Sequence, residues 1–117
     1  MHLIEQLELT GIGKMTCFGN SMTPIITSGS TITFQKFDDY EVGDCVFCKI
    51  RGHFIDCHKI IKKNPVRGYL IANNHGHENG WTRKVYAKMV AIEWEIATIV
   101  SNVYQRETVL KLEDSEN

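Results

Sequence analysis

Ser21, His58 and Lys59 are the side chains in this sequence whose types and setting fit nucleophilic catalysis. A serine hydroxyl is a poor nucleophile at neutral pH, so it needs a neighbouring base and backbone N–H groups that stabilise the oxyanion. Gly19 would let a substrate backbone approach Ser21, and the Thr23-Pro24 step fixes the chain direction after it. These features favour Ser21 as a nucleophile over the alternative, a serine that hydrogen-bonds only within its own turn.

Two residues are candidates for the base, because His58 and Lys59 follow each other in a predicted strand. Neighbouring strand residues face opposite sides of a sheet, so only one of them can point at Ser21. An imidazole works as a base near neutral pH without heavy burial, whereas a lysine base must be kept neutral by burial. We therefore expect His58 to be the base and keep Lys59 as the alternative base. The simpler interpretation is a surface histidine on an edge strand.

The elements that must position these residues are mostly short strands. Leu3, Ile4 and Leu7 have helical spacing before Gly11, which predicts a short helix over residues 2–10. Apolar and alternating runs between turn residues predict strands over residues 31–37, 45–51, 53–61, 69–72 and 87–93, a polar loop over 73–80, and a C-terminal helix or arm with an acidic tail over 94–117. The sequence therefore predicts one mainly β domain over residues 1–117, built as a small, bent antiparallel sheet or partly open β-barrel.

Length and composition limit the classes of function. A chain of 117 residues with 43% hydrophobic and 23% charged residues is an ordinary globular domain. The net charge of −1 and the spread of basic residues argue against a nucleic-acid partner. One local basic cluster is interpreted as a solvated turn, and it consists of Lys59, Lys62, Lys63 and Arg67. No apolar run is long enough to span a membrane and no export signal is visible, so we expect a soluble, cytoplasmic protein.

Cysteine and histidine residues raise the question of a metal site. The candidate ligands are Cys45, Cys48, Cys57, His58, His75 and His77. Residues three apart on a strand face opposite sides, so Cys45 and Cys48 are poorly placed to share one ion. We therefore expect buried, reduced thiols, and no metal or other cofactor.

Four short motifs occur in a fixed order along the chain. They are Gly19-Asn20-Ser21-Met22-Thr23-Pro24, Ser28-Gly29-Ser30-Thr31-Ile32-Thr33-Phe34, Val42-Gly43-Asp44-Cys45-Val46-Phe47-Cys48 and Cys57-His58-Lys59-Ile60-Ile61. In this order they resemble the superfamily of signal peptidase I and the self-cleaving SOS repressors, the LexA-like serine peptidases, over residues 15–93. The resemblance implies a partly open β-barrel of the LexA and signal-peptidase type, with Ser21 as the nucleophile.

The resemblance also implies roles for the neighbours of Ser21. Gly19, Asn20 and Met22 flank the nucleophile and are expected to contact the substrate. Gly19 stands where bacterial signal peptidases often have a hydroxyl residue that helps to hold the oxyanion, so backbone donors are expected here. The bacterial enzymes and the repressors use a lysine base, whereas archaeal and endoplasmic-reticulum signal peptidases use a histidine in a box that the segment around His58 resembles.

A third residue would orient the imidazole. In the histidine-type relatives an Asp-Asn-Asn box and a following acidic loop supply it, and here the box reads Ala72-Asn73-Asn74. The resemblance therefore implies that Glu78, later in the loop, replaces the missing aspartate. Because the aspartate of the box is missing, a member of the superfamily that has lost its catalytic activity is a real alternative.

Two familiar roles of the superfamily are not expected. Only 20 residues precede Ser21, and they contain neither an Ala-Gly nor a Cys-Gly cleavage site nor a DNA-binding domain, which disfavours a self-cleaving regulator. The lack of a membrane helix disfavours ordinary removal of signal peptides. The leading hypothesis is a serine endopeptidase that cuts a peptide or protein in trans, laid along a sheet edge as an added strand. The alternative is a non-enzymatic adaptor or inhibitor that binds a protein partner, of the kind a phage or mobile element could encode.

Overall fold

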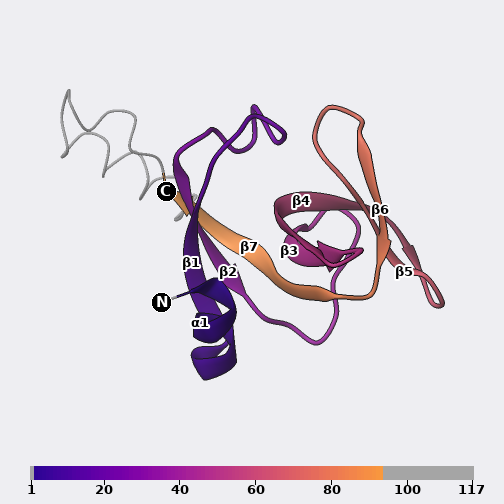
Figure 1. The fold of residues 1–117 in the computed structure, drawn as a ribbon, viewed down its shortest axis with the longest axis horizontal. Coiled ribbons are helices and arrows are strands. Elements are labelled where there is room, and N and C mark those ends of the chain that lie inside the picture. Colours follow the sequence, from indigo (N-terminus) through magenta and orange to yellow (C-terminus); the bar gives the residue numbers. More distant parts are fainter. Residues whose placement is uncertain (1, 94–117) are drawn as a thin grey trace, which may run out of the picture.

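The computed structural model describes residues 2–93, which form one helix and one seven-stranded antiparallel sheet (Figure 1). The elements are α1 (Leu3–Thr10), β1 (Ile12–Cys17), β2 (Ser30–Gln35), β3 (Cys45–Ile50), β4 (His53–Asn64), β5 (Gly68–Ala72), β6 (Glu78–Thr82) and β7 (Val85–Glu93). The strands lie in the order β1-β2-β7-β3-β4-β5-β6. The curled sheet with a short N-terminal helix confirms the mainly β architecture that the sequence predicts.

Strand β7 joins the two halves of the sheet (Figure 1). Lys88 marks the change of partner, because it pairs with Gln35 of β2 on one side and with Val46 of β3 on the other. A register shift interrupts each pairing, one after Thr33 on β2 and one after Phe47 on β3. Such irregularities bend a strand and increase its twist, so the sheet curls with β1 and β2 on one side of β7 and β3 to β6 on the other.

Strand β3 contributes to two hydrophobic cores. Alternate side chains of a strand point to opposite faces, and here both faces are covered. The first core includes Leu3, Leu7, Phe34, Cys45, Phe47 and Cys57, and the second includes Tyr40, Val46, Cys48, Ile60 and Ile71. Cys45 and Cys48 therefore lie in different cores, in agreement with the prediction that they face opposite sides of the sheet.

The helix packs on β1 through a glycine. Leu3 and Leu7 are buried one turn apart, and the helix ends at Gly11, whose φ of 80° is left-handed. A Cβ on Gly13 would lie 2.7 Å from Leu3 Cδ1 and 2.9 Å from Gln6 Cβ, so the close approach needs glycine. No strand is predicted over residues 12–17, yet β1 forms there because it pairs along the whole of β2.

Two further predictions concern the loop over residues 73–80 and the C-terminal segment over residues 94–117. The loop predicted over residues 73–80 is wrong at its end, because β6 begins at Glu78 and pairs with β5. Asn79 and Gly80 have low strand propensity, so pairing rather than local preference makes this strand. The C-terminal helix predicted over residues 94–117 lies outside the described residues.

The loop between β2 and β3 is tied to β4 and β5 through Asp39. Its carboxylate accepts hydrogen bonds from Lys63 Nζ at 2.7 Å and from Tyr69 Oη at 2.6 Å. The Lys63 ammonium, followed by the Tyr69 hydroxyl, lowers the pKa of Asp39 to about 2. The folded state therefore favours the ionised carboxylate.

Asp39→Asn should weaken the dependence of stability on pH in acid. Because the folded-state pKa lies below the ordinary value of about 3.9, Asp39 stabilises the fold above that pH, and the contribution disappears as the pH falls towards 2. In urea unfolding followed at several pH values, we expect the variant to be less stable than the wild type near neutral pH and to converge with it in acid. Asp38→Asn, one residue away, is the control, and parallel pH curves for Asp39→Asn and the wild type would contradict the assignment.

Candidate active site

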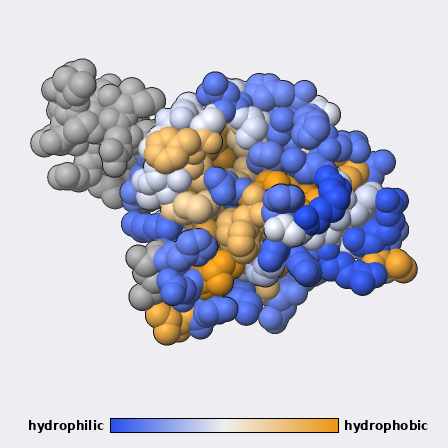
Figure 2. All heavy atoms as spheres, viewed as in Figure 1, coloured by the Kyte–Doolittle hydropathy of each residue, from blue (hydrophilic) through white to orange (hydrophobic). Residues whose placement is uncertain are grey.

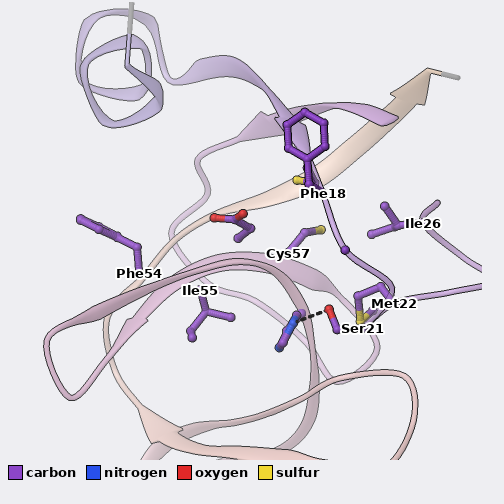
Figure 3. A pocket seen from close by; sticks show the side chains of 11 residues that line it. Phe18, Ser21, Met22, Ile26, Phe54, Ile55 and Cys57 are labelled. Atoms are coloured by element: carbon purple, nitrogen blue, oxygen red, sulfur yellow. Dashed lines mark hydrogen bonds between the residues drawn. The ribbon is translucent and has the colours of Figure 1, made fainter. Parts of the chain in front are cut away.

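A pocket of about 220 Å³ lies between the chain that follows β1 and the first half of β4. Figure 3 shows side chains from both segments around it, and Figure 2 shows apolar side chains gathered on this face between the two halves of the sheet. The apolar lining residues are Cys17, Phe18, Met22, Ile26, Phe54, Ile55 and Cys57. Ser21, Asp56 and His58 supply polar groups to the wall, so the pocket can hold an apolar side chain beside Ser21 and His58.

The loop that carries Ser21 is fixed on both sides of the serine. Met22 is only 3% exposed and anchors the loop in the first core. The N–H of Gly29 donates to the carbonyl of Cys17 at 2.8 Å and closes the loop at its base. The N–H of Asn74 donates to the carbonyl of Ser21 at 2.8 Å. The serine is therefore held by tertiary contacts rather than only by its own turn.

Ser21 and His58 are in direct contact. Ser21 Oγ lies 2.9 Å from His58 Nε2, and His58 Nδ1 lies 2.7 Å from Asn79 Oδ1 (Figure 3 shows the serine contact). The amide oxygen of Asn79 can only accept, so Nδ1 of His58 carries the proton and donates to it. Nε2 then presents its lone pair to the Ser21 hydroxyl, which donates. This tautomer is the one that a general base needs.

The orienting position next to the imidazole is occupied by Asn79, not by Glu78. Glu78, which the sequence analysis expects there, has an exposed side chain. Successive residues of a strand face opposite sides, so the residue after Glu78 in β6 is the one directed at His58. The expected carboxylate is thereby replaced by an amide. Strand alternation could have found Asn79, but the sequence analysis treats this segment as a loop.

Lys59, the alternative base, contacts a different group. Its Nζ donates to Asn74 Oδ1 at 3.1 Å, while the neighbouring His58 contacts Ser21. The Asn74 amide also donates through Nδ2 to the carbonyl of Thr23 at 2.9 Å. Lys59 therefore supports the Ser21 loop through Asn74. This contact is not predicted from the sequence.

The three residues expected to flank a substrate differ in their surroundings. Gly19, with φ of 105°, and Met22 line the pocket. Asn20 is exposed, and its carbonyl lies 3.0 Å from His75 Nε2, which also lies 3.0 Å from Thr23 Oγ1. We name residues 73–77 the clamp loop, because Asn74 and His75 both hold the Ser21 loop.

The thiols beside the pocket are not competing nucleophiles. Burial, helped by the negative charge of Asp56, raises the pKa of Cys17 to about 11. A hydrogen bond to Cys45 and burial raise the pKa of Cys57, whereas the same hydrogen bond lowers the pKa of Cys45, which lies in the core rather than in the pocket wall. A neutral thiol is a weak nucleophile, so the raised pKa values of Cys17 and Cys57 make these two thiols poor nucleophiles.

The described residues contain neither a cluster of metal ligands nor a helix suited to crossing a membrane. Between residues 2 and 93, no group of three or more His, Cys, Asp or Glu side chains is arranged to hold a metal ion. In the same part of the chain, no helix combines the length and apolar character that a membrane crossing requires.

The curled sheet and a serine facing a histidine define a class of serine-peptidase-like domain, and sequence comparison gives its family. The model of the Peptidase S24-like family matches residues 13–96, well over half of the chain. The chain therefore belongs to the Peptidase S24-like family, which supports the resemblance to the LexA-like and signal peptidase superfamily. Searches of curated proteins and of solved structures give no match.

Asn74→Ala should loosen the Ser21 loop. The substitution removes the hydrogen bond to the Thr23 carbonyl and leaves Lys59 without its amide partner. Losing a partly buried hydrogen bond costs about 1–3 kcal/mol, so amide exchange over residues 18–29 should accelerate roughly 5- to 100-fold. Hydrogen–deuterium exchange with mass spectrometry measures this directly.

Asn64→Ala is the matched control, because Asn64 Oδ1 accepts from the N–H groups of Val66 and Arg67 in a turn away from the pocket. Its effect should stay within that turn. Unchanged exchange over residues 18–29 in Asn74→Ala would show that the clamp loop does not hold the loop that carries Ser21.

Proposed function

We propose that this protein is a serine endopeptidase that cuts a peptide or protein in trans, with Ser21 as nucleophile and His58 as general base. The observation that carries the proposal is the 2.9 Å contact between Ser21 Oγ and His58 Nε2, in the tautomer fixed by Asn79. Membership of the Peptidase S24-like family supports the same class of chemistry.

The residues divide the acyl-transfer reaction between them. His58 Nε2 takes the hydroxyl proton as Ser21 Oγ attacks the substrate carbonyl, and the imidazolium returns that proton to the leaving amine as the peptide bond breaks. Water then attacks the acyl-serine and loses a proton to His58, and the imidazolium gives that proton to Ser21 Oγ as the ester bond breaks and the acid leaves. The backbone N–H of Ser21 makes no hydrogen bond within residues 2–93, and we assign it to the oxyanion.

The substrate strand would lie between two open backbone edges. Strand β4 has β3 along one edge and β5 along the other, but β5 pairs with it only from Lys59 onward. Before His58, this second edge of β4 therefore has no partner strand among the described residues. Strand β1 pairs only with β2 in the same part of the chain, which leaves its second edge open towards Phe18. A peptide added as a strand would set a side chain into the pocket beside Ser21.

Ser21→Ala and His58→Ala should both abolish cleavage. Removing the nucleophile or its base costs about 10⁴-fold or more in triads of this kind. The assay exposes a peptide mixture from a digested proteome to the purified protein and counts new termini by mass spectrometry. His53→Ala, an exposed histidine on the same strand, is the matched control and should retain wild-type cleavage.

Cleavage that persists in Ser21→Ala would overturn the assignment. No cleavage by the wild type, together with capture of the same peptides by the wild type and by Ser21→Ala, would support the adaptor or inhibitor instead. The two functions are therefore separated by one set of variants.

Asn79→Ala should lower kcat by roughly 10- to 100-fold with little change in KM, because the ring loses its fixed tautomer. Asn79→Asp should keep or raise kcat, since a hydrogen bond to a charged acceptor stabilises the imidazolium by about 1 kcal/mol more than one to an amide. Steady-state kinetics on the best peptide from the mixture measures both. Equal losses in the two variants would show that Asn79 has only a structural role.

A further inference from the structure

A second hollow, on the side of the sheet where three turns meet, is lined by Arg51, Arg67 and Arg83. It has a volume of about 370 Å³. We name it the basic hollow and define it by Lys49, Arg51, Arg67, Trp81, Arg83 and Lys84. Every arginine of the described residues lines it, and its lining contains no aspartate or glutamate. The fold therefore concentrates positive charge that the sequence spreads over more than 30 positions.

Backbone contacts direct two of the guanidinium groups. Arg83 donates to the carbonyl of Val66, and Arg51 Nη2 donates to the carbonyl of Asn79 at 2.9 Å. A guanidinium has five N–H donors, so each group keeps donors for a ligand. These side chains are held in place before any partner binds.

The charge of the hollow is not neutralised within the described residues. The ion pairs of residues 2–93 involve Lys14, Lys63 and Lys88, and none involves a residue of the basic hollow. The cluster that stands out in the sequence behaves differently, because Lys59 binds Asn74 and Lys63 binds Asp39 and Glu41. Only Arg67 of that cluster joins the hollow.

An aromatic surface accompanies the charge. The guanidinium of Arg67 lies over the Trp81 ring, 4.4 Å from its centroid, and the indole is only partly buried. Guanidinium groups and aromatic rings are both surfaces on which nucleic-acid bases stack, whereas phosphates pair with free cations. A peptide built of aspartate and glutamate offers anions without flat rings, and a duplex hides the faces of its bases in the stack.

We propose that the basic hollow binds single-stranded nucleic acid through its phosphates and an unstacked base. The inference is independent of the proposed peptidase reaction, since none of its six defining residues lines the pocket at Ser21. It departs from the expectation of no nucleic-acid partner, which rested on the net charge and on the spread of basic residues along the chain rather than on their position in space.

Fluorescence anisotropy of a fluorescein-labelled 15-residue oligothymidine tests the proposal. The basic hollow has five cationic side chains. One phosphate contact for each of them predicts a slope of log Kobs against log salt concentration of about −3.5, because each contact on a single strand contributes about −0.7. Arg67→Gln/Lys84→Gln removes two cations that hold no backbone carbonyl, so the fold should survive. This variant should bind about 10- to 30-fold more weakly near 0.1 M salt, with a slope near −2.

Charge-matched and chemical controls decide between partners. Lys36→Gln/Lys62→Gln removes two exposed cations elsewhere and should bind like the wild type. In a Trp94→Phe background, the oligothymidine should quench the fluorescence of Trp81. Ser21→Ala should bind normally, so failure of the peptidase assignment leaves this test intact.

Four results would overturn the proposal. They are no binding at low salt, equal loss in the two double variants, equally tight binding of a duplex of the same length, and equal displacement of the oligothymidine by a polyglutamate peptide. The last two would mean that charge alone is recognised.

Discussion

The hydrogen bond between Ser21 Oγ and His58 Nε2 is the contact on which the proposed chemistry depends, and it joins residues 37 positions apart. Neither partner is placed by local structure alone. Burial of Met22 and the clamp loop hold the serine, whereas β-pairing and Asn79 hold the imidazole. A hydrogen bond adds only about 1 kcal/mol to stability, so the contact is a result of the fold rather than its cause.

The sequence predicts well what depends on local pattern. Apolar or alternating runs between turn residues locate β2, β3, β4, β5 and β7, and the order of the motifs suggests that Ser21 and His58 belong to one site. What it misses depends on pairing between distant segments. Strand β1 contains Gly13, and β6 contains Asn79 and Gly80, so neither has strong strand propensity and both form against stronger neighbours.

The prediction of Glu78 rather than Asn79 as the partner of the His58 imidazole also fails because β6 forms by pairing with β5. A segment assigned as loop has no alternation to show which side chain faces His58, so the prediction of Glu78 rests only on its place in the acidic loop of the resembling family. Because side chains alternate between the two faces of a strand, β6 directs Asn79 to His58 and leaves Glu78 exposed. Strand β6 also contributes Trp81 to the basic hollow, and Arg51 holds the Asn79 backbone, so the two sites share one structural support.

The central claim is that His58 makes the Ser21 hydroxyl nucleophilic. The most direct measurement is the position and rate of covalent modification by a small fluorophosphonate, with the adduct located by tandem mass spectrometry. The account predicts one adduct, on Ser21, that forms in the folded wild type and not in His58→Ala or after unfolding in urea. Modification of several serines at similar rates, or of Ser21 at the same rate without His58, would contradict it.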